Sequence, residues 1–511
     1  MLSMRIGSLI RRNVPWSTAM HVVWTILLLF HAITRASASV GQVPSVDGII
    51  GGVPSIERHG LTSEGVSTDT WENPIAVPGK VRLVENSRLC EKTPGVYEAA
   101  GYTDLTKTDS IWFWFFAARN NPDTAPLVLW FNGGPGSSSM YGLFQAHGPC
   151  RISNDSRTVN HNPFSWNTNA NVLYIDQPAG VGFSVSLPLK IKTSQQAAGD
   201  IWRFLQIWLS DERFSKLKGR EVGIWTESYG GHYGPAFAKY FLDRNNAIAA
   251  KQITDIPVNL TTLGIGNGLT DPLVQYAWLM SYAVNNPYHP LVNDSVVQAA
   301  NTSWSRKGGC REQIAECYSS DSDTVCSAAQ SYCNSNILTR LNGKYDPYYV
   351  PTPTPNPYPP DFSNYLNQNR LLIETQKIWI GTNYEVYANF AGTGDWMRNS
   401  RGDLEKVVDK GVKVLVYAGD ADYILNYFGI EAMMDALETK FSTDYRTQSF
   451  KNYTVDGLVA GVYKRAGTLS YLRAYGAGHM VPAYSFGSLK AGEAALQMFD
   501  QTQSGKGLEP T

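Results

Sequence analysis

The sequence predicts an α/β fold with a mostly parallel central sheet and helices on both of its faces. Apolar runs such as "PLVLWFNGG" (126–134) and "VKVLVYAGDAD" (412–422) are continuous rather than alternating. Such runs are typical of strands that are buried on both faces of a parallel sheet. Helical patterns lie between the runs, for example at 193–211 and 233–246. This alternation of strands and helices favours a sheet that is covered on both sides.

Strands are expected throughout the chain from about residue 110, except in one region. At about 272–398 the alternation breaks, and this region carries four cysteines and the proline-rich run 346–362. Proline excludes that run from helix interiors and from central strands. Long insertions in α/β enzymes often cover active sites. We therefore expect a catalytic domain over 76–500 with a cap inserted at about 272–398, and a flexible tail over 501–511. The predicted strands are 110–118, 126–134, 171–180, 222–225, 258–268, 412–422 and 470–482.

The composition is that of a large globular protein. The chain has 511 residues, of which 43% are hydrophobic, and its formal net charge is −1. This length can bury a large core, in one big domain or in several smaller ones. The sequence leaves the oligomeric state open. The balanced charge gives no indication of nucleic acid or an anionic membrane as a partner.

The first 38 residues have the pattern of a secretory signal. Arg11 and Arg12 precede an apolar run at 19–33, and the small residues Ala36-Ser37-Ala38 offer a cleavage site. An uncleaved anchor is the alternative, but the run is short for a bilayer span. No later stretch has the pattern of a membrane anchor. Residues 39–75 are rich in Gly, Ser and Pro and predict an irregular extension or a propeptide.

Secretion agrees with two further features, glycosylation sequons and an even number of cysteines. Six cysteines in an oxidising compartment suggest three disulfides. Four of them cluster without an interleaved His, so no metal site is expected. The pairing cannot be deduced from sequence; we expect nested bridges within the cluster Cys310, Cys317, Cys326 and Cys333, and a bridge from Cys90 to Cys150. The plausible glycan sites are Asn154, Asn259, Asn293, Asn301 and Asn452.

Three strand ends carry residues that could form a catalytic triad. Ligands gather at the carboxyl ends of strands in an open α/β sheet, and Ser228, Asp422 and His479 each follow an apolar strand. Their order along the chain is that of an α/β-hydrolase fold. A serine hydroxyl needs a nearby base, which His provides, and a carboxylate fixes the His tautomer. This chemistry needs no cofactor.

Each of these residues also has a simpler interpretation. A Ser at a helix start is often a cap, and an Asp after a strand is often a turn residue. Asp420 competes with Asp422, which we prefer because it lies further beyond the strand end. Position 226 is Thr, where a nucleophile elbow usually has Gly. The joint occurrence of all three residues at strand ends favours the triad.

An oxyanion hole is expected beside the serine. The anionic intermediate needs backbone N–H donors. The glycine-rich loop "FNGGPGSSS" (131–139) follows a strand and could offer them. The amides of Gly134 and of Tyr229, the residue after the nucleophile, are our candidates.

Six blocks together resemble the serine carboxypeptidases, most closely the secreted fungal ones. They are "LVLWFNGGPGSSSMYGLF", "NVLYIDQPAGVGFS", "WTESYGGHYGP", "GIGNGLTDP", "VLVYAGDADYILN" and "YGAGHMVPAYS". The likeness runs from about Cys90 to about Asp500. It implies removal of single C-terminal amino acids from peptides and proteins with a free C-terminus, usually at acidic pH. It also maps Ser228, Asp422 and His479 onto the triad, and Gly134 and Tyr229 onto the oxyanion hole.

The resemblance also implies a binding site for the substrate's terminal carboxylate. The matching residues are Asn132, Gly133 and Glu227, and Tyr141 and Met480 fall where the family shapes the pocket for the departing residue. An ionised Glu227 would repel a carboxylate, whereas a protonated one can donate a hydrogen bond. Binding should therefore favour low pH. The alternative is a Glu227 that stays charged beside a base.

Two positions depart from the family pattern. The family usually carries a second Glu that shares a proton with the first, and Ala146 stands there in this chain. Gln145 and His147 are the neighbours that could compensate. The family also often has Cys where Ser137 stands, with a bridge to the cap, so a more mobile cap is expected. An acyltransferase or esterase, or a catalytically silent binding module, remain the alternative functions.

Overall fold

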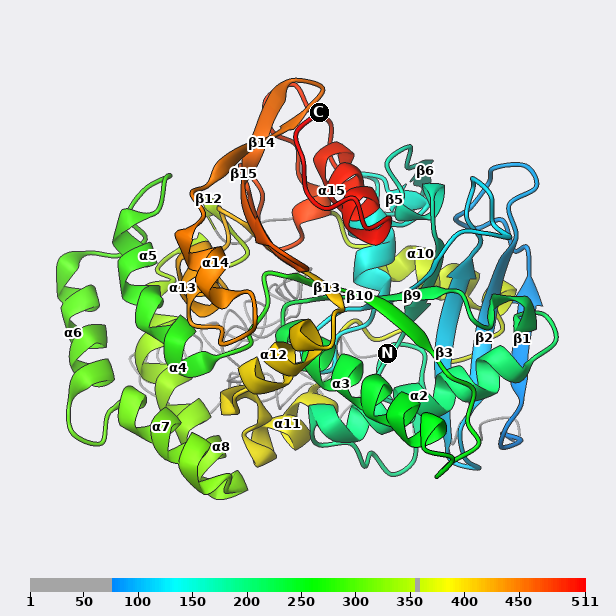
Figure 1. Cartoon of the computed structure of the whole chain (residues 1–511), viewed down its shortest axis with the longest axis horizontal. Coiled ribbons are helices and arrows are strands. Elements are labelled where there is room, and N and C mark those ends of the chain that lie inside the picture. Colours follow the sequence, from blue (N-terminus) through cyan, green and yellow to red (C-terminus); the bar gives the residue numbers. More distant parts are fainter. Residues whose placement is uncertain (1–75, 354–358) are drawn as a thin grey trace, which may run out of the picture. The chain divides into compact units, whose positions relative to one another are not determined.

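A computed structural model describes residues 76–353 and 359–511. The predicted signal and extension, residues 1–75, lie outside the described residues. A twelve-stranded sheet forms the centre, in the order β1-β2-β3-β7-β4-β9-β10-β13-β16-β15-β14, with β8 paired to β3 (Figure 1). The strands are β1 (Val81–Glu85), β2 (Glu98–Asp104), β3 (Asp109–Phe116), β4 (Leu127–Phe131), β7 (Asn171–Ile175), β8 (Val185–Ser186), β9 (Glu221–Glu227), β10 (Asn259–Gly266), β13 (Lys413–Gly419), β14 (Lys451–Val455), β15 (Leu458–Ala466) and β16 (Leu469–Ala474).

The middle of the sheet is parallel and its margins are antiparallel. Strands β7, β4, β9, β10, β13 and β16 run in the same direction. Strands β1–β3 on one side and β14–β15 on the other are antiparallel. All seven predicted strands are present. The outer strands β1, β2, β14 and β15 were not predicted.

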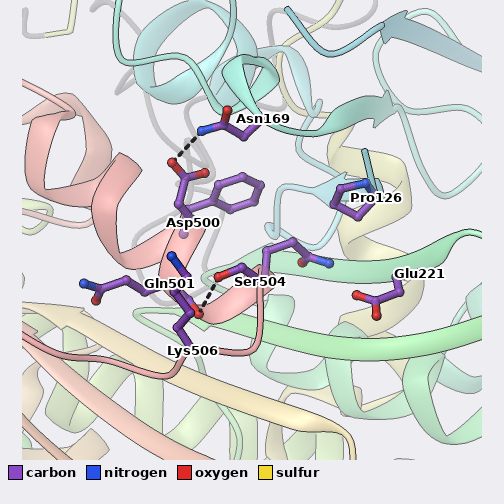
Figure 2. A pocket seen from close by; sticks show the side chains of 9 residues that line it. Pro126, Asn169, Glu221, Asp500, Gln501, Ser504 and Lys506 are labelled. Carbon is purple, nitrogen blue, oxygen red and sulfur yellow. Dashed lines mark hydrogen bonds between the residues drawn. The ribbon is translucent and has the colours of Figure 1, made fainter. Parts of the chain in front are cut away.

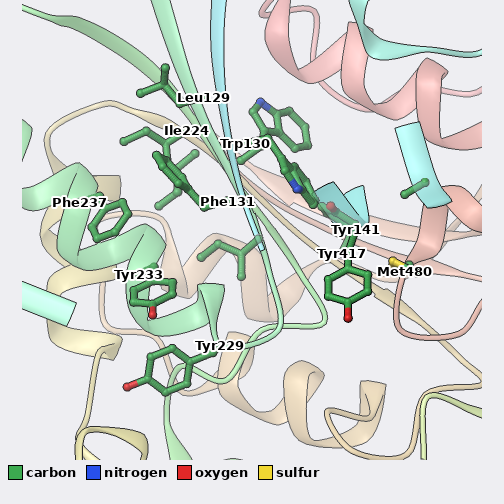
Figure 3. Packing of buried hydrophobic residues seen from close by; sticks show 14 of the residues in the cluster. Leu129, Trp130, Phe131, Tyr141, Ile224, Tyr229, Tyr233, Phe237, Tyr417 and Met480 are labelled. Carbon is green, nitrogen blue, oxygen red and sulfur yellow. The ribbon is translucent and has the colours of Figure 1, made fainter. Parts of the chain in front are cut away.

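Side chains from the parallel strands alternate between two covered faces. Figure 1 shows α2 (Ser194–Ser210), α3 (Gly230–Ala249) and α12 (Arg401–Asp409) on one side of the sheet and α15 (Glu493–Gln503) on the other. Phe131 packs edge-on against Phe237 of α3, with ring centroids 5.1 Å apart. Its neighbour Trp130 lies on the opposite face, as Figure 3 shows. Because both faces are covered, these strands are apolar along their whole length.

The region between the neighbouring strands β10 and β13 is a largely helical insertion. It also holds a short hairpin, β11 (Tyr345–Asp346) and β12 (Tyr349–Pro353). Disulfides Cys310–Cys333 and Cys317–Cys326 join two of its helices in the nested pairing expected, and Cys90 pairs with Cys150. The helices are α4 (Pro272–Gln275), α5 (Leu279–Asn285), α6 (Asp294–Ser305), α7 (Cys310–Ser320), α8 (Asp323–Cys333), α9 (Thr339–Leu341), α10 (Ser363–Asn369), α11 (Tyr384–Thr393) and α12.

The C-terminal end differs from the predicted flexible tail. Helix α15 continues to Gln503, and Leu508 is buried. The backbone N–H of Thr511 donates to the carbonyl of Thr454, and its carbonyl accepts from Gly457. The last residues are therefore held against β14 and its turn. Among residues 76–353 and 359–511, no helix has the length and apolar character needed to cross a membrane.

Candidate active site

Ser228 lies on a sharp turn between a strand and a helix. Strand β9 ends at Glu227 and α3 begins at Gly230. Ser228 has φ of 66°, in the left-handed region that non-glycine residues rarely adopt. Its N–H donates to the carbonyl of Gly266 at 2.9 Å, and its carbonyl accepts from Gly231 at 3.0 Å. This is the geometry of a nucleophile elbow, in which a strained turn holds the serine at the edge of the sheet.

Thr226 is accommodated because the glycine lies on the other arm of the turn. The Thr226 hydroxyl donates to the carbonyl of Gly230 at 3.0 Å. A Cβ added at Gly230 would lie only 2.5 Å from the Thr226 Cβ. The tight approach of strand and helix thus needs a small residue at one of two facing positions. The departure from the usual elbow pattern is explained by this contact.

His479 and Asp422 form a buried hydrogen-bonded pair. The His479 Nδ1 lies 2.8 Å from Asp422 Oδ2, and neither residue is exposed. Burial raises the pKa of Asp422, while its contacts with His479 and Asn267 lower it. Asp420 turns elsewhere and accepts from the Tyr288 hydroxyl at 2.6 Å. Asp422 therefore occupies the position of an orienting carboxylate.

Asn267 is a polar residue of the site that the sequence analysis did not single out. Its Nδ2 donates to Asp422 Oδ2 at 2.8 Å, and its Oδ1 accepts from the backbone N–H of Gly419 at 3.0 Å. A lone Asn after a strand resembles an ordinary turn residue, so only its place directly after β10 could have indicated this role. It restrains the Asp422 carboxylate and the end of β13 together.

The three strand ends lie at one edge of the sheet. Strands β9, β10, β13 and β16 are consecutive neighbours and parallel, so their carboxyl ends point the same way. Ser228 follows β9, Asp422 follows β13 and His479 follows β16. The segment Gly266–Asn267 links two of these residues. The carbonyl of Gly266 accepts from the N–H of Ser228, and the side chain of Asn267 donates to Asp422.

The glycine-rich loop passes directly over the Ser228 turn. A Cβ added at Gly133 would lie 2.4 Å from the Tyr229 nitrogen and 2.9 Å from the Ser228 Cβ. Gly134 has φ of 108°, a conformation that favours glycine. The backbone of the loop and the backbone of Tyr229 are therefore adjacent. This is the arrangement that two convergent N–H donors require.

Asn132 and Glu227 also meet beside the serine. The Asn132 Nδ2 donates to Glu227 Oε1 at 3.2 Å, and both side chains are buried. The other end of the Asn132 amide is fixed, since its Oδ1 accepts from Trp130 Nε1 at 2.8 Å and from the Gly142 N–H at 2.9 Å. Burial raises the pKa of Tyr417, and the nearby charge of Glu227 raises it further. Tyr417, on β13, is another neighbour that the sequence did not indicate.

Tyr141 and Met480 lie on the face of the sheet that carries Trp130 and Tyr417 (Figure 3). Both are buried, and the Tyr141 ring packs edge-on against Trp379, with centroids 5.7 Å apart. The structure thus places the two predicted pocket residues on the same side of the strands.

The side chains next to Ala146 do not replace the missing carboxyl. Residues 142–147 form one buried turn of π-helix. The Gln145 amide donates to the carbonyl of Pro360 at 2.8 Å. The His147 Nδ1 lies 3.0 Å from the Tyr174 hydroxyl, and burial lowers the pKa of His147 well below its usual value. Both side chains are therefore engaged with residues other than Glu227.

Ser137 is fastened to the insertion by hydrogen bonds. We name residues 377–383 the strap. The Ser137 hydroxyl lies 3.1 Å from that of Thr382, and the two residues pair as an antiparallel bridge. Ser138 accepts from Trp379 Nε1 at 2.9 Å, and Asn383 N–H donates to the carbonyl of Gly136 at 2.9 Å. The loop that lacks a cysteine is thus held to the insertion by several polar contacts, and a more mobile cap stays a prediction.

Asp176, a buried acid, lies near Lys377, which is the first residue of the strap. Asp176 Oδ1 accepts from the Ser138 hydroxyl at 2.6 Å and from the Ser139 N–H at 2.9 Å. Lys377 donates to the carbonyls of Gly180 and Ser184. Burial raises the pKa of Asp176 to about 6 and lowers that of Lys377 to about 8, and the charge of each opposes the shift of the other.

The remaining predicted site residues lie on the surface. All five sequon asparagines, at positions 154, 259, 293, 301 and 452, are exposed. A cavity of about 360 Å³ lies at the opposite ends of these strands, where Pro126 precedes β4 and Glu221 begins β9 (Figure 2). Asn169 donates to Asp500 there at 2.7 Å. This cavity contains none of the predicted catalytic residues.

The fold matches that of a solved carboxypeptidase. The crystal structure of a prohormone-processing carboxypeptidase from Saccharomyces cerevisiae superposes with a TM-score of 0.66. The match is 22% identical and covers 80% of this chain and 91% of that chain. It confirms the predicted α/β-hydrolase fold.

Comparisons of sequence identify the family. A family model described as serine carboxypeptidase matches residues 90–505. Carboxypeptidase S1 from Penicillium janthinellum is 38% identical over 437 residues, which cover 84% of this chain and 100% of that protein. Carboxypeptidase Y from Schizosaccharomyces pombe is 36% identical over 425 residues, which cover 79% of this chain and 41% of that protein. The chain therefore belongs to the serine carboxypeptidase family.

Proposed function

We propose that Ser228, His479 and Asp422 form the catalytic triad of a peptidase that releases C-terminal residues. The hydrogen bond of 2.8 Å between His479 and Asp422, at the strand edge that also carries the strained Ser228 elbow, is the observation that carries this proposal. No other buried His–Asp pair with this hydrogen bond lies within residues 76–353 and 359–511.

The hydrogen bond to Asp422 supports a separate role for each nitrogen of His479. Its Nδ1 donates to Asp422, which leaves Nε2 as the base that takes the proton from Ser228. The Ser228 oxygen attacks the carbonyl carbon of the last peptide bond, and the departing amino acid takes a proton from the imidazolium. Water then hydrolyses the acyl-enzyme by the same two proton transfers. Asn267 holds Asp422 in place throughout.

The backbone amides of Gly134 and Tyr229 are proposed to stabilise the tetrahedral oxyanion. The close approach of Gly133 to the Tyr229 nitrogen supports this, because it brings the loop and the start of α3 together. Donors that are fixed before the reaction stabilise the charge that develops in the transition state more than the substrate itself.

Asn132, Gly133 and Glu227 are proposed to bind the terminal carboxylate of the substrate. The 3.2 Å contact between Asn132 and Glu227 supports a shared site for one small anion. A protonated Glu227 can donate to that anion, whereas an ionised one repels it. Substrate binding should therefore weaken as pH rises. Tyr141 and Met480 would contact the side chain of the departing residue.

We further propose that the protein acts in an oxidising compartment, either outside the cell or in a vacuole. Its three disulfides and the exposure of all five sequons support this. Its partners would be peptides and proteins with a free C-terminus.

Blocked dipeptides with a free or an amidated C-terminus test the proposal. Purified protein should cleave the free acid much faster than the amide between about pH 3 and 8, and Ser228→Ala should cleave neither. Asn132→Ala should raise KM for the free acid and leave the slow cleavage of an ester substrate unchanged. Equal cleavage of acid and amide would contradict carboxylate recognition and favour a general esterase or acyltransferase.

A further inference from the structure

The hairpin β11–β12 touches the loop that carries Asp422. We name residues 345–353 the site hairpin. The carbonyl of Pro347 accepts from the N–H groups of Tyr423 and Ile424 at 3.0 and 3.1 Å, and the Val350 N–H donates to the carbonyl of Ala421 at 3.0 Å. These hydrogen bonds restrain the backbone on both sides of Asp422. The hairpin thus restrains the orienting carboxylate from outside the sheet.

The same hairpin also forms a hydrogen bond with the backbone of His479. The His479 N–H donates to the carbonyl of Tyr348 at 2.9 Å, and the Tyr348 ring lies 5.1 Å from the imidazole. A Cβ added at Gly478 would lie 2.3 Å from that carbonyl, so the approach is close. Asp422 and His479 follow different strands. The site hairpin therefore spans the two loops whose relative position sets the catalytic hydrogen bond.

Asp346 holds the turn that makes these contacts. Its Oδ1 accepts from the Tyr348 N–H at 2.8 Å, and the residue is only 8% exposed. The charges of Asp422 and His479 both act on it, in opposite directions. Asp420, a further buried carboxyl at this edge, has Arg473 near it. Asp346 is thus a second acid near Asp422 and His479, and it acts on both through its charge.

We propose that Asp346 is a positioning residue for His479, which it holds through the Tyr348 turn and whose imidazolium it stabilises by its negative charge. This inference rests on the proposed triad. When Ser228 gives up its proton, a positive charge forms on His479. A buried carboxylate close by lowers the free energy of that charged state.

The effect of the charge must depend on pH. Burial raises the pKa of Asp346 to about 6. The backbone N–H groups of Tyr348 and Tyr349 and the charge of His479 oppose this shift, and the charge of Asp422 adds to it. Below this value Asp346 is neutral and only caps the turn. Above it, Asp346 carries the charge that favours the imidazolium. Removal of the charge should therefore slow the reaction at pH 7 and have little effect at pH 4.

Two variants separate the two roles. Asp346→Asn keeps an oxygen that can accept from Tyr348 but removes the charge, and Asp346→Ala removes both. The readout is the second-order rate at which an organophosphorus reagent labels Ser228, because this reaction uses His479 and needs no terminal carboxylate. Asp361→Asn is the matched control, since Asp361 is an exposed acid in the same insertion. Thermal unfolding of each variant reports whether it folds.

We expect Asp346→Asn to label three- to tenfold more slowly at pH 7 and within twofold of the parent at pH 4. Asp346→Ala should lose rate at both values, and Asp361→Asn at neither. An equal loss at pH 4 and pH 7 in a folded Asp346→Asn, or no loss at all, would overturn the proposal. Absence of Ser228 labelling in the parent protein, with Ser228→Ala as reference, would instead overturn the proposed triad.

Discussion

The sheet and the insertion contribute to the candidate site in different ways. The sheet carries all three proposed triad residues on turns that directly follow parallel strands. The insertion supplies no triad residue, yet its site hairpin and strap bond to the backbone of the loops that surround them. Strand ends therefore place the reacting groups, and the insertion restrains the loops that bear or cover them. Mutations in the two regions should differ in size accordingly.

The largest effect is expected for a residue on the sheet. Asp422→Asn should lower kcat/KM for a blocked dipeptide by about 10⁴, because the amide favours the wrong His479 tautomer. Asp420→Asn is the matched control, since Asp420 is also buried but bonds to Tyr288 and Gly476. We expect it to lose less than about tenfold. If Asp420→Asn lost more kcat/KM than Asp422→Asn, Asp420 and not Asp422 would be the carboxylate that orients His479.

A smaller but large effect is expected where the loop crosses the elbow. Gly133→Ala places a methyl group 2.4 Å from the Tyr229 nitrogen, so the loop must move away from the proposed oxyanion hole. A misplacement of about 1 Å can cost about 10² in rate. We therefore expect kcat to fall by about this factor. Gly402→Ala serves as control, because its Cβ would meet nothing within 4 Å. If Gly133→Ala kept the kcat of the parent, the glycine-rich loop would not contribute to the proposed oxyanion hole.

The strap should contribute less than the sheet. Ser138→Ala removes the acceptor of Trp379 Nε1 and a donor to Asp176. Leaving buried groups unpaired costs about 1–3 kcal/mol, and we expect a loss of about tenfold in kcat from a displaced loop. Ser137→Ala, which removes only the contact with Thr382, should lose about twofold. If the two variants are equal in steady-state kinetics, the strap does not act through Ser138.

The smallest effect on activity is expected for Cys317–Cys326, one of the two disulfides between α7 and α8. Cys317 lies next to the carbonyl of Met397, and Asp395 accepts from the Tyr229 hydroxyl, so this disulfide is linked to the site through the segment 395–397. Replacing Cys317 and Cys326 by Ser together should change kcat/KM by less than about twofold. The unfolding free energy should fall by about 2–3 kcal/mol for a loop of 9 residues, measured by urea unfolding. A large loss of activity without loss of stability would show that the helical part of the insertion also restrains the site.

Sequence reasoning located the parallel centre of the sheet and its strand ends because burial on both faces imposes continuous apolar runs. The outer strand β2, "EAAGYTD", gave no such signal, because it is buried along its whole length but its small and polar residues do not form a continuous apolar run. The site hairpin and the strap could not be predicted, because each depends on contacts between residues far apart in the chain. Asn267 was missed for a different reason: one Asn after a strand is too common to indicate a function.

The facing pair Thr226 and Gly230 has a consequence for recognising such enzymes. The space needed at the elbow belongs to two positions jointly, so either one can supply the small side chain. A search that fixes glycine two residues before the serine would pass over this chain. A search that requires one small residue at either position of the pair would retain it. An elbow with the usual pattern should likewise accept Thr two residues before the serine, provided that the facing position stays glycine.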